Sequence, residues 1–541
     1  MSKALELAAE AGLKVWSVTA DGTAVNIKTF ELLGCKFVAN YDGMVTSFKH
    51  PTTSEAVFVI LDPCHMLKLA RNALEAYGSF VDGNGNKIKW QHIKELQKLQ
   101  ENEGLTLGNK LSSQHVQFQK HKMNVRLAAQ TLSSSVANAI EFLDKSFKLP
   151  EFQNSNGTVE FLRTIDRLFD MLNSRSLLGN GFKTPLKLVN ISLWEEIFSS
   201  SAHYLLSLKT DTKTPQLLST SQRKTFIIGF VACVKSTICM ATKMLSDPTD
   251  PFKYLLTYKF SQDHVELLFS CIRSRGGWNN NLNCLQLKYA LRKMLMRNAI
   301  TASKNANCVD FTGCNAIIPL FHKRKHKEDE SKKEETTTEQ EDSTEVNFMF
   351  RHLDQEQHSE FVSNVLFYIA GYIISQIINE ISCPACKSCF ISSPTDSSAR
   401  HHEAETAAAF TNFINKGGIK IPSSSVYRAV EYSEHVFKAM VSGKDGNEIS
   451  NQSKLKEKMI IQVNKHFMLD TTSTLFSDHE EGTNECLVED DHKTMLIKFT
   501  ANEHFTLRLF TYGKIYERKV IHNGKQSDRH RLNKLTLFNN E

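Results

Sequence analysis

The sequence predicts an α/β domain that is interrupted by an all-helical block and followed by a second, mainly helical region. Residues 1–88 alternate β-like runs with helical patterns, which is typical of a partly parallel sheet. Residues 89–250 show helical spacing almost throughout, and a short acidic helix follows them. We therefore expect a discontinuous α/β domain into which the helical block is inserted.

The composition bounds the class of protein. The chain has 541 residues, 41% of them apolar, which is enough for three or four domains with cores of their own. Its 65 basic and 59 acidic residues nearly balance, so the net charge of +6 permits nucleic-acid binding without requiring it. Twelve cysteines are scattered and no secretory signal opens the chain, so we expect reduced thiols in the nucleus or cytosol.

The first region contains a strand that is expected to be buried on both faces. The run AVFVIL at 56–61 is apolar throughout, and Asp62-Pro63 follows it directly. Binding sites in parallel sheets lie at the carboxyl ends of strands, where Asp62 stands. The other elements expected in this region are a strand at 15–20 and helices at 2–12, 26–33 and 65–77.

The remaining chain is predicted to be mainly helical. The expected domains are 1–88 (α/β), 89–250 (helical insertion), 251–320 (return to the α/β domain), 321–345 (disordered charged linker), 346–470 (helical) and 471–541 (irregular tail). Helices are expected at 88–101, 116–147, 159–173, 188–208, 221–245 and 285–299, and short β-like runs at 495–500 and 505–512.

Two uncommon segments need a physical interpretation. Residues 361–378 carry no charge and approach membrane-spanning length, but Asn364 and three other polar residues favour a buried core helix. The linker begins with HKRKHK, which is similar to a nuclear localisation signal and is predicted to be solvated.

Three acidic residues are candidates for a metal site. Asp62 stands at a strand end, and Asp263 and Glu266 lie one helical turn apart. Carboxylate oxygens are the ligands that hard cations prefer, and two-metal nucleases use them to clamp a phosphodiester. The structural alternatives are an N-cap at Asp62 before Pro63, and a capping box formed by Asp263 and Glu266.

Several motifs occur in an order that resembles one known family. They are VTADGTAVN with FELLGCKF, DPCHMLKLARN, YKFSQDHVELLFSCIRSRGG, YIAGYI followed by CPAC, and GGIKIPSSSVY. Together they span residues 10–440 and resemble the P element transposases, including vertebrate relatives linked to a THAP DNA-binding domain. The resemblance implies an RNase H-like core interrupted by a GTP-binding helical insertion, and Mg²⁺-dependent DNA cleavage and strand transfer. By motif, Asp62 is the second catalytic acid, Glu266 the last and Asp263 an accessory acid.

The sequence departs from the family pattern at its start. In an RNase H-like fold the first acid lies on the first strand, and two strands and a helix precede the strand of the second acid. Counting back from Asp62 makes 15–20 the third strand, so strands one and two and the THAP domain are expected to be missing. Asp21 is then interpreted as a turn or N-cap residue. We expect impaired cleavage, and the alternative is a domesticated, non-catalytic module that binds DNA, GTP or protein.

The insertion contains the runs HKMNVRLAAQTLSSSVANAI and FLRTIDRLFDMLNSR, which resemble the family's GTP-binding domain. No GxxxxGK[ST] loop is present, which excludes a Walker-type site. We expect Lys122 or Arg126 near phosphate and Asp170 or Asn173 near the base, because a carboxylate accepts two hydrogen bonds from guanine. The alternative is surface charge and local capping.

The last candidates concern zinc and partners. Cys383, Cys386 and Cys389 have spacing suited to Zn²⁺, with His401 or His402 as the fourth ligand, and the alternative is reduced thiols in a turn. The basic helix at 285–299 suits DNA phosphates. The resemblance implies transposon-end DNA, GTP and further copies of the chain as partners, a nuclear location and no membrane.

Overall fold

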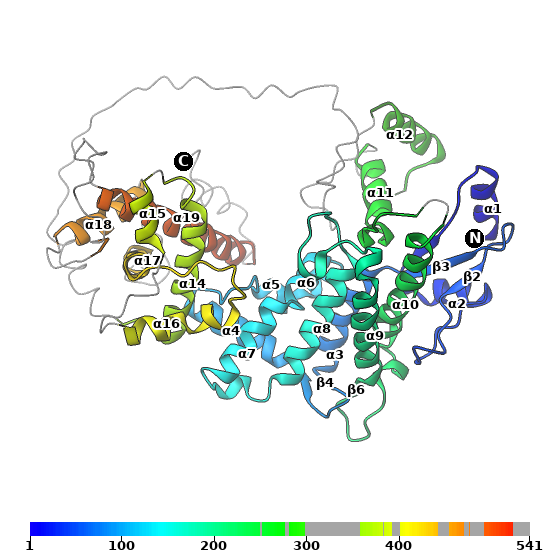
Figure 1. Cartoon of the computed structure of the whole chain (residues 1–541), viewed down its shortest axis with the longest axis horizontal. Coiled ribbons are helices and arrows are strands. Elements are labelled where there is room, and N and C mark those ends of the chain that lie inside the picture. Colours follow the sequence, from blue (N-terminus) through cyan, green and yellow to red (C-terminus); the bar gives the residue numbers. More distant parts are fainter. Residues whose placement is uncertain are drawn as a thin grey trace. The chain divides into compact units, whose positions relative to one another are not determined.

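The computed structural model describes residues 1–248, 251–275, 281–297, 357–381, 383–391, 401–441, 454–469, 475–476 and 492–522. The chain divides into two compact units, which are considered separately (Figure 1). The first unit combines Met1–Leu99 with Asn109–Asp329, and the second combines Gln100–Gly108 with Glu330–Glu541. The charged linker at 321–345, with its HKRKHK run, lies outside the described residues.

The first unit contains a three-stranded sheet with the order β1-β3-β2. Strand β3 (Ala56–Leu61) pairs in parallel with β1 (Ser17–Ala20) and antiparallel with β2 (Ser47–Lys49). The two strands expected from the sequence are therefore present, and they form the predicted parallel pair. Strand β2 was not predicted, because its three residues have no recognisable period.

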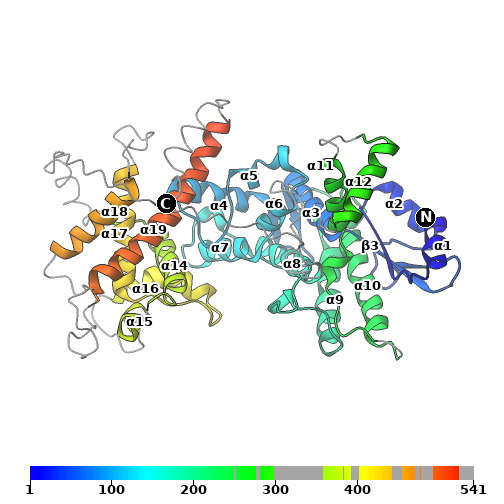
Figure 2. The same ribbon diagram turned by 90° about the horizontal axis from the view of Figure 1, so that it is seen from above.

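Two helices bury the central strand. Helix α3 (Pro63–Tyr77) follows β3, and helix α10 (Thr225–Leu245) packs against β3, α3 and α9 (Ile191–Ser207), as Figures 1 and 2 show. Two hydrogen bonds attach α10 to the strand, from Cys233 Sγ to Leu61 O (2.6 Å) and from Ser236 Oγ to Val59 O (2.6 Å). The apolar run of β3 is almost fully buried in this way.

The insertion contains more and shorter helices than predicted. The expected helix at 116–147 is divided into α5 (Ser113–Val116), a 3₁₀ turn, α6 (Val125–Thr131) and α7 (Ser134–Lys145). The breaks have a local cause, because Asn124 Oδ1 accepts from Leu127 N and Ser133 Oγ accepts from Val136 N, and such caps start new helices. Helices α4 (Trp90–Glu103) and α8 (Asn156–Leu172) lie close to their expected positions.

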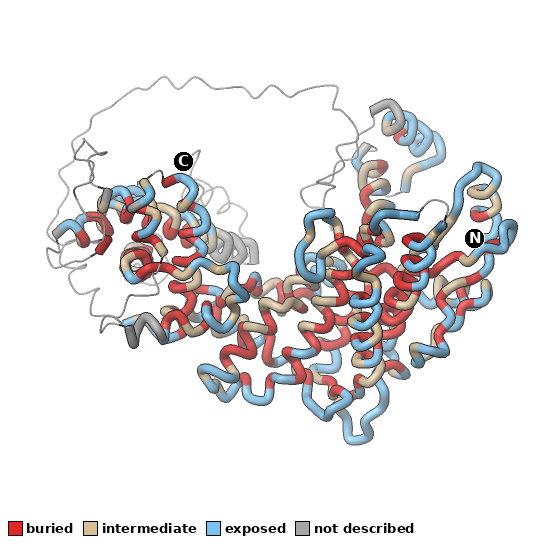
Figure 3. Tube along the Cα trace, in the orientation of Figure 1, coloured by how far each residue is buried: buried red, intermediate tan, exposed pale blue. Residues whose placement is uncertain are grey.

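The other elements of this unit are smaller. They are α1 (Ser2–Glu10), α2 (Ala24–Leu32), α11 (Asp263–Arg275), α12 (Cys284–Arg297), the sheet β5-β4-β6 (Lys87–Lys89, Ser79–Val81, Lys209–Thr210), and 3₁₀ turns at Phe118–His121, Pro150–Phe152, Gly181–Lys183, Leu188–Asn190, Leu218–Thr220 and Thr257–Phe260. Figure 3 shows buried positions concentrated in the central helices of the unit, whereas α1 is mostly exposed.

The regular elements of the second unit are helices within its described residues, apart from a single β-bridge between Ile391 and Pro422. Its elements are α14 (Glu360–Ile377), α15 (Pro384–Phe390), α16 (His401–Ile414), α17 (Ser424–Val441), α18 (Leu455–Leu469) and α19 (His492–His522). The β-like runs expected at 495–500 and 505–512, in an irregular tail, were wrongly predicted, since both lie in α19. The buried apolar positions of this helix follow a helical face, and they are Leu496, Ile497, Ala501, Phe505 and Leu509.

Among the residues that the structure describes, two helices are long and apolar enough to cross a membrane, and both are largely buried within their own units. They are Thr225–Leu245, 78% buried, and Glu360–Ile377, 61% buried over the most apolar window. In the second helix, Asn364 Nδ2 donates to Thr406 O (3.0 Å) and Asn364 Oδ1 accepts from Phe410 N (2.8 Å). The polar residue that argued against a membrane span thus joins α14 to α16.

A buried ion cluster joins α17 to α19. Arg508 donates from Nε and Nη2 to the two carboxylate oxygens of Glu434 (2.7 and 2.8 Å), and His504 Nε2 lies 3.1 Å from Glu434 Oε2. Burial alone would raise the pKa of Glu434, but Arg508 and His504 lower it to about 2. Its charge therefore stabilises the fold above the ordinary pKa of a glutamate, and this stabilisation is lost as pH falls from about 4.5 toward 2.

We predict that Arg508→Leu lowers the free energy of unfolding by about 3–5 kcal/mol, because it removes the guanidinium that contacts both carboxylate oxygens of the buried Glu434. Urea unfolding at pH 7 measures the loss. The matched control is Lys454→Ala, which removes an exposed pair with Glu457 and is expected to change stability by less than about 1 kcal/mol. Equal effects of the two substitutions would contradict this account of the cluster.

We also predict that Gly229→Ala destabilises the first unit by about 1–3 kcal/mol. A Cβ atom at Gly229 would lie 1.9 Å from Met66 Sδ, and Met66 is fully buried between α3 and α10. Gly418→Ala is the control, since nothing lies within 4 Å of a Cβ there. Thermal unfolding measures both, and adding Met66→Ala to Gly229→Ala should cost less than the sum of the single changes.

Candidate functional site

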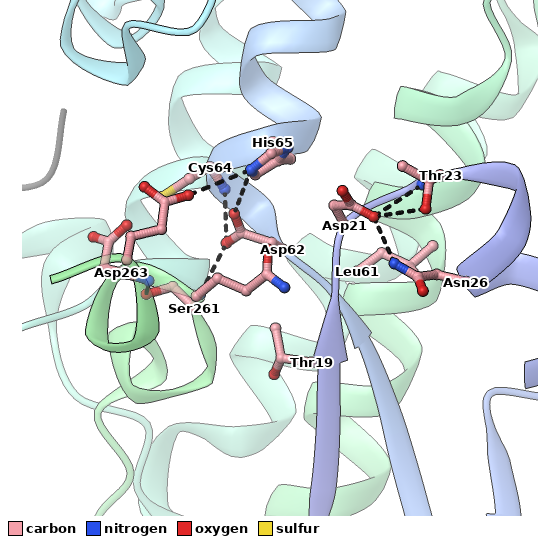
Figure 4. Close-up of polar contacts among 12 residues, drawn as sticks. Thr19, Asp21, Thr23, Asn26, Leu61, Asp62, Cys64, His65, Ser261 and Asp263 are labelled. Carbon is pink, nitrogen blue, oxygen red and sulfur yellow. Dashed lines mark hydrogen bonds and ion pairs between the residues drawn. The ribbon is translucent and has the colours of Figure 1, made fainter. Parts of the chain in front are cut away.

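Asp62 stands at the junction of the central strand and its following helix. It is the N-cap of α3, its side chain is 1% exposed, and Pro63 occupies the first helical position. Its Oδ1 atom accepts from Cys64 N (3.3 Å) and from Gln262 N (3.5 Å), as Figure 4 shows around Asp62. The capping interpretation of Asp62 is thus confirmed, and the same carboxylate also contacts a backbone segment 200 residues later.

That later segment opens the acidic helix. Gln262 directly precedes α11, whose first turn contains Asp263 and Glu266. The side chain of His65, on α3, lies between the two regions: its Nε2 atom is 3.8 Å from Asp62 Oδ2 and 3.6 Å from Glu266 Oε1. The expected approach of Asp62 and Glu266 across the inserted block is therefore found, with one imidazole facing both acids.

Asp21 is a third acid at the same edge of the sheet, and sequence reasoning set it aside. The register pairs Ala20 with Leu61, so Asp21 and Asp62 each follow the last residue of neighbouring parallel strands. Figure 4 shows both extending from the same end of these strands. The pairing makes the strand at 15–20 a direct neighbour of the strand that precedes Asp62, and the count of strands before it stays a prediction. The overlooked signal was the repeated pattern of a β-like run ending in Asp, in VTAD and VILD.

The side chain of Asp21 also has a local role. Its Oδ1 accepts from Thr23 N (3.2 Å), Thr23 Oγ1 (2.8 Å) and Asn26 Nδ2 (2.6 Å). The N-cap of α2 is Thr23, so Asp21 is a turn residue in front of the helix. Burial opposes ionisation, but these hydrogen bonds and the nearby charge of His65 hold the pKa of Asp21 below its ordinary value.

Asp263 contacts an arginine in this structure. Arg175 Nη2 donates to Asp263 Oδ2 at 3.0 Å, and Arg175 comes from the segment after α8. Burial raises the pKa of Asp62, the charge of His65 lowers it, and the negative charge of Asp263 raises it further. The electrostatics of Asp62 thus depend on what neutralises Asp263.

Asp62 and Glu266 offer oxygen atoms of the type that Mg²⁺ prefers. Asp62 Oδ2 and Glu266 Oε1 both lie near His65 Nε2, so the two acids converge on one region. Within the described ranges, no group of three or more His, Cys, Asp or Glu residues is arranged to hold a metal ion. The carboxylate oxygens therefore suit a hard cation. In this structure Asp62 caps α3 and accepts hydrogen bonds from backbone amides.

The expected nucleotide residues fall into two groups. Lys122 and Arg126 are exposed around the start of α6, and Lys122 O accepts from Arg71 Nη2 (2.7 Å). Asp170 and Asn173 lie at the end of α8, where Asp170 Oδ2 is 3.5 Å from Lys183 Nζ. Burial and the nearby charge of Asp166 raise the pKa of Asp170 to about 6, while Lys183 opposes them.

One hydrogen bond joins α7 to α8 near the second of these groups. Ser134 N, at the start of α7, donates to Asp166 Oδ2 (3.0 Å), one turn before Asp170 on α8. The contacts of Lys122 and Asp170 described above run to Arg71 and Lys183, and they do not join the two expected nucleotide groups directly.

The three cysteines proposed for zinc lie around α15. Cys383 is the N-cap of this helix, and Cys386 and Cys389 are buried. The side chains of His401 and His402, the expected fourth ligands, lie outside the described residues. Burial of two of the three thiols is consistent with the alternative that they are core side chains.

Three domain families match consecutive parts of the chain. The family described as "TNP-like, GTP-binding insertion domain" matches residues 64–185, and "TNP-like, RNase H C-terminal domain" matches 258–292. The family described as "DNA transposase THAP9, C-terminal domain" matches 357–514. The first match begins two residues after Asp62, and the second contains Asp263 and Glu266.

Two curated proteins and one solved structure are similar to this chain. Human "DNA transposase THAP9" is 28% identical over 488 residues, covering 85% of this chain and 50% of the relative. "Transposable element P transposase" of Drosophila melanogaster is 26% identical over 339 residues, covering 61% and 42%. The structure titled "Drosophila P element transposase strand transfer complex" has 25% identity, a TM-score of 0.46, and coverage of 55% and 63%.

These matches agree with one another and with the order of the motifs. The chain spans about half the length of the curated relatives that it matches. The matched GTP-binding insertion, residues 64–185, lies between Asp62 and Glu266, and the acidic helix α11 lies within the matched RNase H segment, residues 258–292. Together, the three family models and the two curated relatives support a P element-like transposase family for this chain.

Proposed function

We propose that this chain cleaves and joins DNA with Mg²⁺ held by its sheet-edge acids, and that its insertion binds GTP. One observation carries the proposal: Asp62 and Glu266, far apart in the sequence, have carboxylate oxygens within 4 Å of the same His65 Nε2. Sites of parallel sheets lie at this edge, and Asp21 stands beside Asp62 there. The match of residues 258–292 to the TNP-like RNase H segment and the similarity to a curated DNA transposase support this assignment.

Each acid has a distinct role in the proposed site. The amides of Cys64 and Gln262 orient Asp62 through Oδ1, which leaves Oδ2 toward Glu266 and His65. Asp62 Oδ2 and Glu266 Oε1 would hold the ion, with Asp21 as a further acid from the neighbouring strand. Mg²⁺ held by these residues would supply Lewis-acid polarisation of the phosphodiester and of the attacking oxygen. Because burial raises the pKa of Asp62, its carboxyl holds a proton more readily than an exposed aspartate does.

A non-catalytic module that binds DNA, GTP or protein is the second candidate. Within the described ranges, no three possible ligands surround a common point, and Asp21 Oδ1 is engaged by Thr23 and Asn26. This arrangement favours a retained fold whose acids serve capping and hydrogen bonding. The transposon ends, further copies of the chain and a nuclear location are proposals that accompany either candidate.

GTP is proposed to bind with its base at the end of α8. Asp170 and Asn173 offer a carboxylate and an amide within one turn of each other, and Lys122 and Arg126 supply positive charge at the start of α6. The match to a GTP-binding insertion domain over residues 64–185 contains all four residues. A carboxylate distinguishes guanine from adenine, because it accepts from two neighbouring N–H groups of guanine.

We predict that the chain cleaves labelled duplex DNA in Mg²⁺ or Mn²⁺, and that Asp62→Asn, Glu266→Gln and Asp21→Asn each reduce the rate by at least about 100-fold, since a lost ligand weakens the ion at least as much as lost outer contacts do. Gel electrophoresis of the products measures the rate. The control is Glu31→Gln, an exposed acid paired with Lys28 on α2.

The outcomes separate the two candidates. Cleavage that disappears in the acid variants but persists in the control supports the enzyme. Intact duplex under all conditions, together with calorimetry that detects no Mn²⁺ binding to the folded wild-type chain, supports the non-catalytic module. Cleavage that survives in all three acid variants would contradict the proposed site.

We predict that GTP affinity rises about tenfold between pH 5 and pH 7, because Asp170, with a pKa of about 6, accepts from guanine only when it is ionised. Calorimetry at several pH values measures the affinity, with ATP as the control nucleotide. Asp170→Asn should weaken GTP binding and remove the pH dependence. Asp166→Asn should move the midpoint to lower pH, since the charge of Asp166 helps to raise the pKa of Asp170. A flat profile in the wild-type chain would exclude Asp170 from the base site.

A further inference from the structure

Arg175 connects the proposed base site to the acidic helix. Its Nε atom donates to Asn173 Oδ1 (3.3 Å), and its Nη2 atom donates to Asp263 Oδ2 (3.0 Å). Asn173 ends α8 and Asp263 begins α11, so one guanidinium joins two helix ends, and Arg175 is 88 residues from Asp263 in the sequence. The planar fork of arginine holds two acceptors in a fixed relation, which a lysine does not.

The backbone around Arg175 is attached to the same segment. Ser174 N donates to Thr257 Oγ1 (3.0 Å), and Tyr258 N donates to Ser174 O (3.2 Å). The 3₁₀ turn Thr257–Phe260 therefore packs on the end of α8 and leads directly into α11. On its other side, Thr19 Oγ1, next to the end of β1, donates to Phe260 O (2.8 Å). A short series of hydrogen bonds thus joins the end of α8 to the segment before the acidic helix and to β1.

The charge of Asp263 links this hydrogen-bonded path to the pKa of Asp62. Asp263 is buried, and its negative charge raises the pKa of Asp62. Arg175 neutralises Asp263, and it also fixes the first turn of the helix that presents Glu266. Movement of Arg175 would change both the electrostatics of Asp62 and the position of Glu266. The Arg175 side chain also donates to Asn173, the residue that is proposed to contact the nucleotide base.

We propose that Arg175 is a positioning residue through which nucleotide binding at the end of α8 orders the acidic helix α11. A base that engages Asn173 competes with Arg175 Nε for the Asn173 amide oxygen, so the guanidinium shifts its hydrogen bonding toward Asp263. Binding of the nucleotide and ordering of the acids then become linked, and the linkage is reciprocal. This inference rests on the GTP binding proposed above and does not require that the chain cleaves DNA.

Hydrogen exchange tests the link without any cleavage assay. Mass spectrometry compares exchange in peptides covering residues 262–273 of the 541-residue chain, with and without saturating Mg²⁺-GTP, and calorimetry measures GTP binding separately. In the wild-type chain, GTP should slow exchange there by at least about fivefold, the lower end of typical coupling between sites. Arg175→Ala and Asp263→Asn should lose this effect while still binding GTP, and Arg175→Lys should keep only part of it.

The matched control is Arg163→Ala. The side chain of Arg163 is 31% exposed and pairs with Glu141, which is 12% exposed; the corresponding values for Arg175 and Asp263 are 34% and 11%. Arg163 lies on the same α8 helix but contacts α7, so its loss should leave the GTP effect on residues 262–273 intact.

The outcomes distinguish this inference from the proposed function. GTP binding without slower exchange at 262–273, or slower exchange that persists at full strength in Arg175→Ala, would overturn the coupling alone. An effect lost equally in Arg163→Ala would show a general loss of packing and would also overturn it. If the wild-type chain does not bind GTP, both the nucleotide assignment and the coupling fail. Circular dichroism checks folding, and Arg175→Lys and Asp263→Asn keep the test decisive if Arg175→Ala does not fold.

Discussion

The site depends on the parallel pairing of β1 with β3. This pairing places Ala20 beside Leu61, so the residues that follow both strands emerge at one edge of the sheet. Helix α10 covers β3 and donates side-chain hydrogen bonds to Leu61 O and Val59 O, which holds the strand at its position. Because the ends of the two strands are paired, Asp21 and Asp62 lie side by side, and the chain inserted after α3 does not separate them.

A second constraint is electrostatic. Carboxylates that are removed from water need hydrogen bonds or opposite charges, and each acid near the sheet edge has them. Asp62 accepts from two backbone amides and faces His65, whereas Asp263 is neutralised by Arg175. The two acids therefore have different partners despite their proximity. His65 contacts the acids that would share an ion, and Arg175 connects to the insertion.

The insertion is attached to the α/β domain at more than its two chain connections. Ser174, at the end of α8, exchanges hydrogen bonds with Thr257 and Tyr258, in the turn before α11. An inserted module that was joined only by its ends would move independently of the sheet. Here the end of α8 and the start of the acidic helix share a hydrogen-bonded junction, so the helical block takes part in positioning Glu266.

The sequence by itself determined the two strands, most of the long helices and the candidates Asp62 and Glu266, because continuous apolar runs, helical periodicity and family motifs are local signals. It did not reveal the breaks at Asn124 and Ser133 in the expected 116–147 helix. It also predicted β-like runs within what is helix α19, since a short apolar run fits both the helical and the strand period. Only the tertiary structure decided the roles of Asp21, His65 and Arg175. Their importance comes from strand register and from contacts between distant segments. For Asp21 the repeated VTAD and VILD runs were a local sign, whereas no local pattern in the chain encodes the contacts of His65 and Arg175.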